Sequence, residues 1–240
     1  MNSYTTFSQI YDSVMDNYDY DRVFQWLKSL MPEKRELEIL EMAMGTGRLT
    51  EKLADIGKVT GFDYSADMLA LAEERLRGRG VPLLQLDLRT FDINKTYDCI
   101  LCLCDGMNYL KSDEELLQSF LRVEKHLKKG GLFVFDMNTH VRFSDYGNFT
   151  EMREEDNFTL IWENDYDPPV NEYCITMFVR DKDGKYDRYR EIHEERAFDR
   201  QQVESLLREA GLKLIEAYDG YTDRKAHDKT ERICYVVEKN

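Results

Sequence analysis

The strongest constraint on the fold is a regular alternation of apolar, strand-like runs with segments of helical periodicity over roughly the first 140 residues. The helical pattern is clearest over Asp113–His126, which is followed by two lysines and two glycines, a typical helix end. Strands separated by helices join through right-handed crossovers and form a parallel sheet with helices on both faces. The expected strands are Leu37–Met42, Lys58–Asp63, Pro82–Asp87, Asp98–Leu103 and Gly131–Asp136.

The alternation stops after the fifth strand. Between Arg142 and Arg196 no long helical stripe is present, and three stretches favour strands instead: Phe158–Trp162, Tyr173–Arg180 and Tyr186–Ile192. An Asp-Gly turn at Asp183-Gly184 joins the last two, which is a strong hairpin signal. We therefore predict a small antiparallel β insertion over residues 142–196, placed between two parts of one domain, residues 1–141 and 197–240.

A helix over Asp199–Ala210 and two further strands, Leu212–Tyr218 and Arg232–Val237, follow the insertion. The last two strands are joined by a loop, so they can pair antiparallel at the sheet edge. The predicted fold class is α/β: a doubly wound, mostly parallel, seven-stranded Rossmann-like sheet with the antiparallel insertion.

Charge and cysteine content exclude several classes of function. Lysine plus arginine total 33 and aspartate plus glutamate 47, which gives a net charge of −14. A protein this acidic repels phosphate backbones and anionic membranes, so we expect neither nucleic acid nor membrane as a partner.

No apolar run approaches the roughly 20 residues of a membrane span, and no signal peptide is visible. Five cysteines, an odd number, favour a reducing compartment and thus the cytoplasm. Whether the chain is a monomer or a homodimer stays open.

The turn after the first strand, Glu41-Met-Ala-Met-Gly45-Thr-Gly47, is a candidate ligand site, because open α/β sheets bind ligands at the carboxyl ends of their strands. A dinucleotide motif would need a third glycine, and Thr50 or Arg48 stands in its place. Glu41 would also repel a pyrophosphate. A nicotinamide-dependent oxidoreductase is therefore disfavoured.

Three acidic residues close three consecutive strands: Glu41, Asp63 and Asp87. Each alone is compatible with a helix cap or a solvated loop. Together, Glu41 suits a cationic group, Asp63 can accept both hydroxyls of a ribose, and Asp87 can accept from an adenine amine, while Met68 can pack on the purine. This set predicts a site for an adenosine with a cationic tail and no phosphate, which describes S-adenosyl-L-methionine.

Four segments, EMAMGTGRLT, GFDYSADML, LLQLDLRTF and YDCILCLCDGMNYL, resemble motifs of the class I S-adenosylmethionine-dependent methyltransferases. Ala43 replaces the first glycine of the usual motif. The N-terminal segment and the insertion resemble those of a bacterial subgroup of this family. That subgroup carries a small antiparallel insertion after strand five, and methyltransferases that act on small molecules such as amino sugars carry one as well. The resemblance implies a methyltransferase sheet and an enzyme that uses S-adenosylmethionine.

By this resemblance, the methionine part of the cofactor lies near the glycine turn, the ribose at the second strand, and the adenine between the second and third strands. Cys104 lies under the cofactor, and Tyr11 closes over it. The implied cofactor-binding residues are Tyr11, Glu41, Ala43, Gly45, Gly47, Asp63, Tyr64, Met68, Asp87, Leu88 and Cys104.

Methyl transfer is an in-line displacement that needs alignment and exclusion of water, and it needs a base only where the acceptor must lose a proton. Candidate bases at the methyl end are Tyr109, Asp136, His140 and Tyr4; a wall or hydrogen-bonding role is the simpler interpretation of each, and none stands out as catalytic. His193 and Arg196 either contact the acceptor or are solvated. The Cys-x-x-C of Cys99 and Cys102 has its thiols on opposite faces of a strand and no second ligand pair, so no metal site is expected.

The predicted function is methyl transfer from S-adenosylmethionine to nitrogen or oxygen of a small-molecule acceptor. Two alternatives stay open: a cofactor-binding protein without turnover, and a methyltransferase of RNA or protein.

Overall fold

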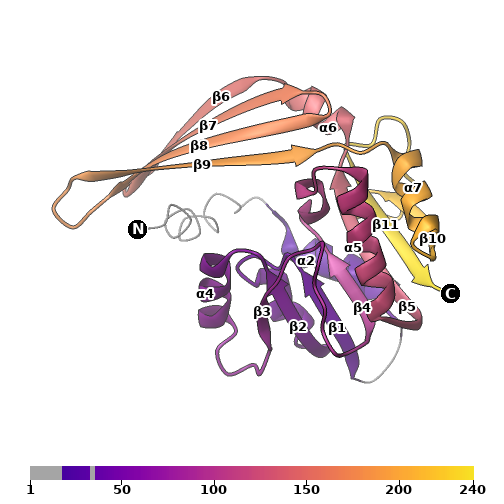
Figure 1. The fold of residues 1–240 in the computed structure, drawn as a ribbon. Coiled ribbons are helices and arrows are strands. Elements are labelled where there is room, and N and C mark those ends of the chain that lie inside the picture. The colour runs from indigo at the N-terminus through magenta and orange to yellow at the C-terminus, as the bar shows by residue number, and fades with distance from the viewer. Residues whose placement is uncertain (1–17, 33–35) are drawn as a thin grey trace.

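The computed structural model describes residues 18–32 and 36–240. Its main sheet has seven strands in the order β10-β11-β5-β4-β1-β2-β3 (Figure 1). β11 runs antiparallel to β5 and β10, whereas β3, β2, β1, β4 and β5 pair in parallel. The predicted doubly wound α/β fold, including its antiparallel edge, is confirmed. The strands are β1 (Leu37–Met42), β2 (Gly57–Asp63), β3 (Leu83–Gln85), β4 (Tyr97–Cys102), β5 (Leu127–Asn138), β10 (Leu212–Asp219) and β11 (Arg232–Lys239).

Helices cover both faces of this sheet because its central strands are apolar on both sides. In β1, for example, Leu40 belongs to the core under α5 and α7, and the adjacent Ile39 belongs to the core under α2 and α3. Cys99 and Cys102 of β4 divide in the same way between the two cores. The helices are α2 (Tyr20–Leu30), α3 (Arg48–Leu53), α4 (Ala66–Arg75), α5 (Asp113–His126) and α7 (Arg200–Glu209).

The helix α5 illustrates how the sequence sets these elements. Ser112 caps its first turn by accepting a hydrogen bond from the Glu115 amide at 3.2 Å, and acidic residues follow in that turn. Phe120 on its apolar face is fully buried against Phe133 and Phe135 of β5. The helix α2 was not predicted from the sequence, although one of its faces is buried through Val23 and Leu27.

The predicted insertion is a four-stranded antiparallel sheet in the order β6-β7-β8-β9, preceded by a short helix. The Asp-Gly turn joins β8 to β9, which confirms the expected hairpin. The strands are longer than predicted, and neither the helix nor β6 was expected. The elements are α6 (His140–Tyr146), β6 (Phe149–Glu154), β7 (Phe158–Asp167), β8 (Val170–Arg180) and β9 (Tyr186–Arg196).

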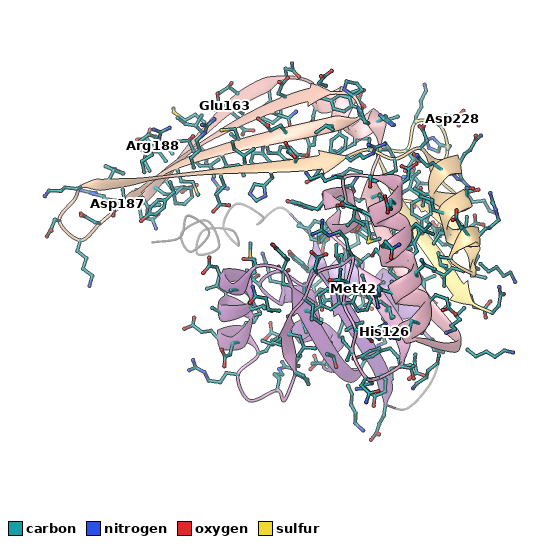
Figure 2. The ribbon with its side chains drawn as sticks, viewed as in Figure 1. Met42, His126, Glu163, Asp187, Arg188 and Asp228 are labelled. Atoms are coloured by element: carbon teal, nitrogen blue, oxygen red, sulfur yellow. The ribbon has the colours of Figure 1, made fainter. Side chains whose placement is uncertain are left out.

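The second sheet arches across the end of the first, with its long hairpin reaching past α4 (Figure 1). Asp187 and Arg188 lie near the far end of that hairpin (Figure 2). One face of the sheet buries Leu160, Ile175 and Met177, a cluster that Met68 of α4 joins from the main domain. In the part of the chain described, no helix is long and apolar enough to cross a bilayer.

Candidate active site

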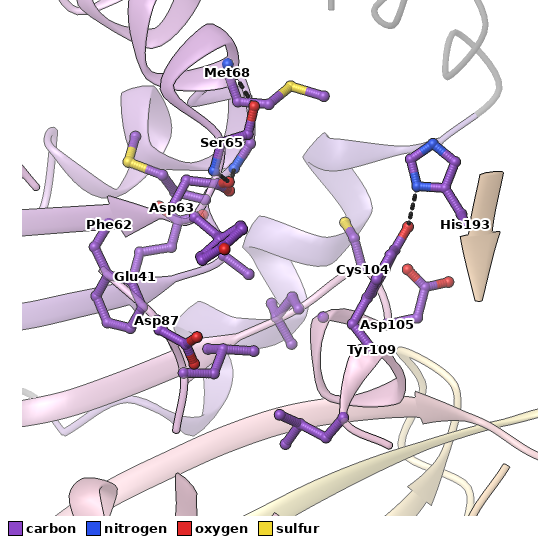
Figure 3. A pocket seen from close by; sticks show the side chains of 18 of the residues that line it. Glu41, Phe62, Asp63, Ser65, Met68, Asp87, Cys104, Asp105, Tyr109 and His193 are labelled. Carbon is purple, nitrogen blue, oxygen red and sulfur yellow. Dashed lines mark hydrogen bonds between the residues drawn. The ribbon is translucent and has the colours of Figure 1, made fainter. Parts of the chain in front are cut away.

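A cavity of about 730 Å³ lies at the carboxyl ends of β1, β2 and β4 and extends to strand β9 of the second sheet. One end holds acidic residues from the first strands, and the other holds Asp105, Tyr109 and His193 (Figure 3). The predicted residues that line the cavity are Glu41, Ala43, Gly45, Asp63, Tyr64, Met68, Asp87, Leu88, Cys104 and Tyr109.

Glu41 is a buried carboxyl group on the cavity wall. It is only 5% exposed, and its Oε2 atom has no hydrogen-bond partner among the described residues. Burial raises the pKa of Glu41 to about 8; the side-chain hydroxyl of Thr50 opposes the rise, and the nearby Asp63 carboxylate adds to it. Among the described residues this buried carboxyl group has no cationic partner, and a ligand in the cavity could supply one.

The turn after β1 brings backbone close to the cavity. Gly45 has φ +54°, and a Cβ atom added there would meet nothing within 4 Å, so space is open above it. Gly47 does not line the cavity. Its φ is +78°, and an added Cβ would lie 3.2 Å from Leu76 Cδ1, so this glycine serves helix packing. Ala43 also has a positive φ, +50°, which is rare for a residue with a side chain.

Asp63 ends β2 and organises the turn beside it. Its Oδ2 atom accepts from the Gly45 amide at 2.8 Å, and its Oδ1 atom accepts from the Ser65 amide at 2.9 Å. Burial raises the pKa of Asp63, and these amide hydrogen bonds oppose the rise. Ser65 in turn caps α4, the helix that carries Met68.

Asp87 lies two residues beyond the end of β3, and its carboxylate is already engaged. Arg89 donates to Oδ2 from Nη2 at 2.5 Å and to Oδ1 from Nε at 2.9 Å. Arg89 also donates to Glu115 at 2.8 Å. The hydrogen bonds from Arg89 lower the pKa of Asp87. An adenine amine at this point would therefore share the carboxylate with Arg89.

The turn after β4 has unusual backbone geometry. Cys104 and Asp105 are consecutive residues with φ +57°. This conformation costs roughly 1–2 kcal/mol for each residue that has a Cβ, and such strain is concentrated at functional sites. The turn also meets the one after β1, because a Cβ atom added to Gly106 would lie 2.9 Å from the Cβ of Ala43.

Beyond this turn, Tyr109 meets strand β9. Its hydroxyl lies 3.4 Å from Nδ1 of His193 (Figure 3). Nε2 of His193 lies 3.2 Å from Oε2 of Glu191. All three residues line the cavity. The inserted sheet thus supplies part of the cavity wall, and it supplies it with ionisable side chains.

Asp136, a candidate base, does not line the cavity. It is fully buried, its Oδ2 atom accepts from the Tyr221 hydroxyl at 2.7 Å, and Arg232 pairs with the same atom. Burial raises the pKa of Asp136, and Arg232 opposes the rise. Arg232 also pairs with Asp105 at 2.9 Å. The carboxylate therefore belongs to a buried network that supports the turn after β4.

His140 also lies away from the cavity. It begins α6, and its Nδ1 atom lies 2.7 Å from the Tyr166 hydroxyl. Tyr4 and Tyr11 fall outside the described residues. The cavity is also lined by Glu191, Tyr20 and Arg48, which were not predicted from the sequence, and by His193, for which the sequence left two roles open. No pattern in the sequence indicates Tyr20 or Arg48 as site residues. Their side chains stack, with 4.7 Å between the guanidinium carbon of Arg48 and the ring centroid of Tyr20.

Comparison with known proteins decides the family. A family model described as "Methyltransferase domain" matches residues 39–131. The crystal structure of an S-adenosylmethionine-dependent methyltransferase from Clostridium acetobutylicum is similar over 100% of both chains, with 33% identity and a TM-score of 0.89. The chain belongs to the S-adenosylmethionine-dependent methyltransferases.

Curated relatives agree with this assignment. The Bacillus subtilis protein named "Putative methyltransferase YqeM" is 28% identical over 99% of this chain and 97% of its own length. A Saccharopolyspora spinosa dTDP-4-amino-2,3,4,6-tetradeoxy-D-glucose N,N-dimethyltransferase is 30% identical over 54% of this chain and 53% of its own length.

The cavity fits the cofactor of this methyltransferase. The α-ammonium of S-adenosylmethionine is the kind of cation that the unpartnered Oε2 atom of Glu41 lacks. Open space above Gly45 leaves room for a ligand against the backbone. A volume of about 730 Å³ lies within the usual range for cofactor sites.

Proposed function

We propose that this methyltransferase transfers a methyl group to the nitrogen of a small, amine-bearing acceptor, held between the turn after β4 and strand β9. The observation that carries the proposal is the acidic character of that end of the cavity. Glu191 is 5% exposed, and its Oε1 atom has no hydrogen-bond partner among the described residues. A buried carboxylate beside aromatic and imidazole groups suits an ammonium or amine.

The cofactor would occupy the opposite end. We assign its α-ammonium to Glu41, its ribose hydroxyls to Asp63 and its adenine to the space beside Tyr64 and Met68. The remaining contacts assigned to it come from Ala43, Gly45, Asp87, Leu88 and Cys104. Bound there, S-adenosylmethionine supplies a methyl group that its positively charged sulfur has already activated.

The protein's own contribution is then alignment and exclusion of water. Residues 142–196 act in this proposal as a lid and acceptor subdomain on the cofactor domain formed by residues 1–141 and 197–240. The support is that β9 provides His193 and Glu191 to the cavity wall, opposite Tyr109 of the cofactor domain.

A small molecule is a better acceptor than a nucleic acid for this chain. The Saccharopolyspora relative is named for an amino sugar substrate, which supports an amine on a small molecule. The net charge of −14 opposes association with RNA or DNA. The odd number of cysteines supports a cytoplasmic site of action.

Radiolabelled methyl transfer tests the proposal. Purified enzyme and S-adenosylmethionine would be incubated with a panel of amino sugars, the matched sugars in which a hydroxyl replaces the amine, and a tRNA transcript at physiological salt. We expect incorporation into one or more amino sugars, little into the hydroxyl analogues and none into RNA. Strong methylation of the transcript, or of hydroxyl compounds alone, would contradict the proposal.

A further inference from the structure

Tyr109, His193 and Glu191 form a continuous chain of hydrogen-bonding groups at the acceptor end of the cavity. The imidazole stands in the middle, with Nδ1 3.4 Å from the Tyr109 hydroxyl and Nε2 3.2 Å from the Glu191 carboxylate. The side chain of Glu191 is 2% exposed and that of His193 17% exposed. Tyr109 is 43% exposed, so the phenol is the member of the chain most accessible to a ligand.

The chemistry of the three groups sets the direction of these hydrogen bonds. An ionised carboxylate only accepts, so the Nε2 atom facing Glu191 carries the hydrogen. A neutral imidazole then has its lone pair on Nδ1, which faces the Tyr109 hydroxyl. The phenol therefore donates to His193, and a hydroxyl oxygen that donates in this way can still accept a proton through its lone pairs.

We propose that Tyr109, His193 and Glu191 act as a proton relay that deprotonates the acceptor ammonium before methyl transfer. The inference deepens the proposed function and rests on it, because it takes the acceptor to be an amine, which arrives as a cationic ammonium. An ammonium has no lone pair with which to attack the methyl carbon, so it must lose a proton first.

The proton balance of the relay is simple. An N–H bond of the ammonium breaks, and the proton passes to the Tyr109 oxygen while the phenol's own proton passes to Nδ1 of His193. The products are a neutral amine, an unchanged phenol and an imidazolium paired with Glu191. The imidazolium later returns its proton to solvent. Glu191 stabilises the charged ring and fixes its tautomer, so it is a positioning residue.

The other charged groups at this end already have partners. Asp105 accepts from Arg232 at 2.9 Å and from Asn138 at 2.7 Å. Glu194, the neighbour of His193 on β9, pairs with Lys111 at 2.9 Å. Across the sheet, Tyr173 and Ile175 of β8 lie opposite His193 and Glu191 and bring no charge at neutral pH.

Two measurements on the full-length enzyme test the relay. The first needs no acceptor: ¹⁵N NMR of the histidine rings, with His193 assigned by its absence in His193→Asn. We expect the Nε2–H tautomer in the wild type and a weaker preference for it in Glu191→Gln. The second is steady-state kinetics with the amino sugar that the wild type methylates fastest. We expect kcat to fall about 100-fold or more in Tyr109→Phe and His193→Asn and about tenfold in Glu191→Gln.

Matched controls separate the relay from general effects of substitution. Tyr186→Phe at the hairpin end, His227→Asn in an exposed loop and Glu172→Gln on β8 make the same chemical changes outside the cavity, and each should retain wild-type kcat. In Tyr109→Phe and His193→Asn, cofactor affinity and KM should stay within threefold. Added imidazole should restore part of the turnover of His193→Gly.

The two possible failures are distinguishable. An Nδ1–H tautomer of His193, or turnover of Tyr109→Phe and His193→Asn within threefold of the wild type, overturns the relay and leaves the proposed function standing. Absence of turnover on every amine contradicts the proposed function, and the ring tautomer then still decides whether the hydrogen-bond chain exists.

Discussion

The pH dependence of cofactor affinity gives a direct test of the role assigned to Glu41. Burial raises the pKa of this carboxyl group to about 8, so most molecules of the free enzyme hold it protonated at neutral pH. A ligand ammonium pairs with the ionised form only. Binding must therefore release a proton, and affinity must rise with pH.

The magnitude follows from the pKa of about 8. The ionised fraction of Glu41 is about 0.01 at pH 6 and about 0.24 at pH 7.5, so affinity should rise about 24-fold across this range. This ratio corresponds to about 1.9 kcal/mol of binding free energy. At pH 7 the protonated fraction is about 0.9, which is the number of protons that binding should release.

Isothermal titration calorimetry with S-adenosylhomocysteine measures both quantities, because this ligand keeps its ammonium charged between pH 6 and 7.5. Proton release appears as a difference in binding enthalpy between phosphate and Tris buffers at the same pH. Glu41→Gln should bind about tenfold more weakly at pH 7.5, with a nearly flat pH profile and little proton release. A flat profile in the wild type, or proton uptake on binding, would refute the assignment of Glu41.

Three further predictions concern the same site and its lid. Asp63→Ala should weaken cofactor binding about tenfold or more by calorimetry, because it removes charge-assisted hydrogen bonds worth roughly 1.5–3 kcal/mol; unchanged binding would exclude Asp63 from the ribose site. Gly45→Ala should abolish cofactor binding, because its Cβ would enter open cavity space, whereas Gly47→Ala should leave that space open; both place a Cβ at positive φ and should lower the free energy of unfolding in urea by roughly 1–2 kcal/mol, with the larger loss at position 47, where the Cβ also crowds α4; equal effects on binding would contradict this division. Deleting residues 181–184 at the hairpin turn should leave cofactor affinity within twofold, and a collapse of affinity would mean that the lid has another role.

Most of the fold could be predicted from the sequence because burial imposes simple patterns. Strands β1 and β4 lie under helices on both faces, so they appear as continuous apolar runs. β6 is different: most of its residues, including Glu151 and Met152, are exposed, so the strand has no alternating pattern to recognise. β3 is shorter than expected because its pairing with β2 ends at Gln85, before the acidic residue that follows.

The site could be predicted only where it follows from strand ends. Glu41 and Asp63 stand at the carboxyl edge of a parallel sheet, and topology alone brings them together. Asp136 was predicted to end its strand in the same way, but β5 continues to Asn138, and Arg232, far away in the sequence, binds Asp136 from the neighbouring strand. Glu191 and His193 come from a strand of the insertion, and nothing in their local sequence indicates which face of that strand meets the cavity.

The close approach of Ala43 and Gly106 restricts the order in which this site can change during evolution. A methyl group at position 106 would lie 2.9 Å from the Ala43 Cβ and 3.0 Å from the Cys102 sulfur, so alanine there is blocked while position 43 has a side chain. Glycine at position 43 would relieve the positive φ and remove the first of these contacts. The two positions are therefore epistatic: after glycine at 43, alanine at 106 meets only the Cys102 sulfur, whereas the reverse order passes through a variant that also clashes with Ala43 under the cofactor site.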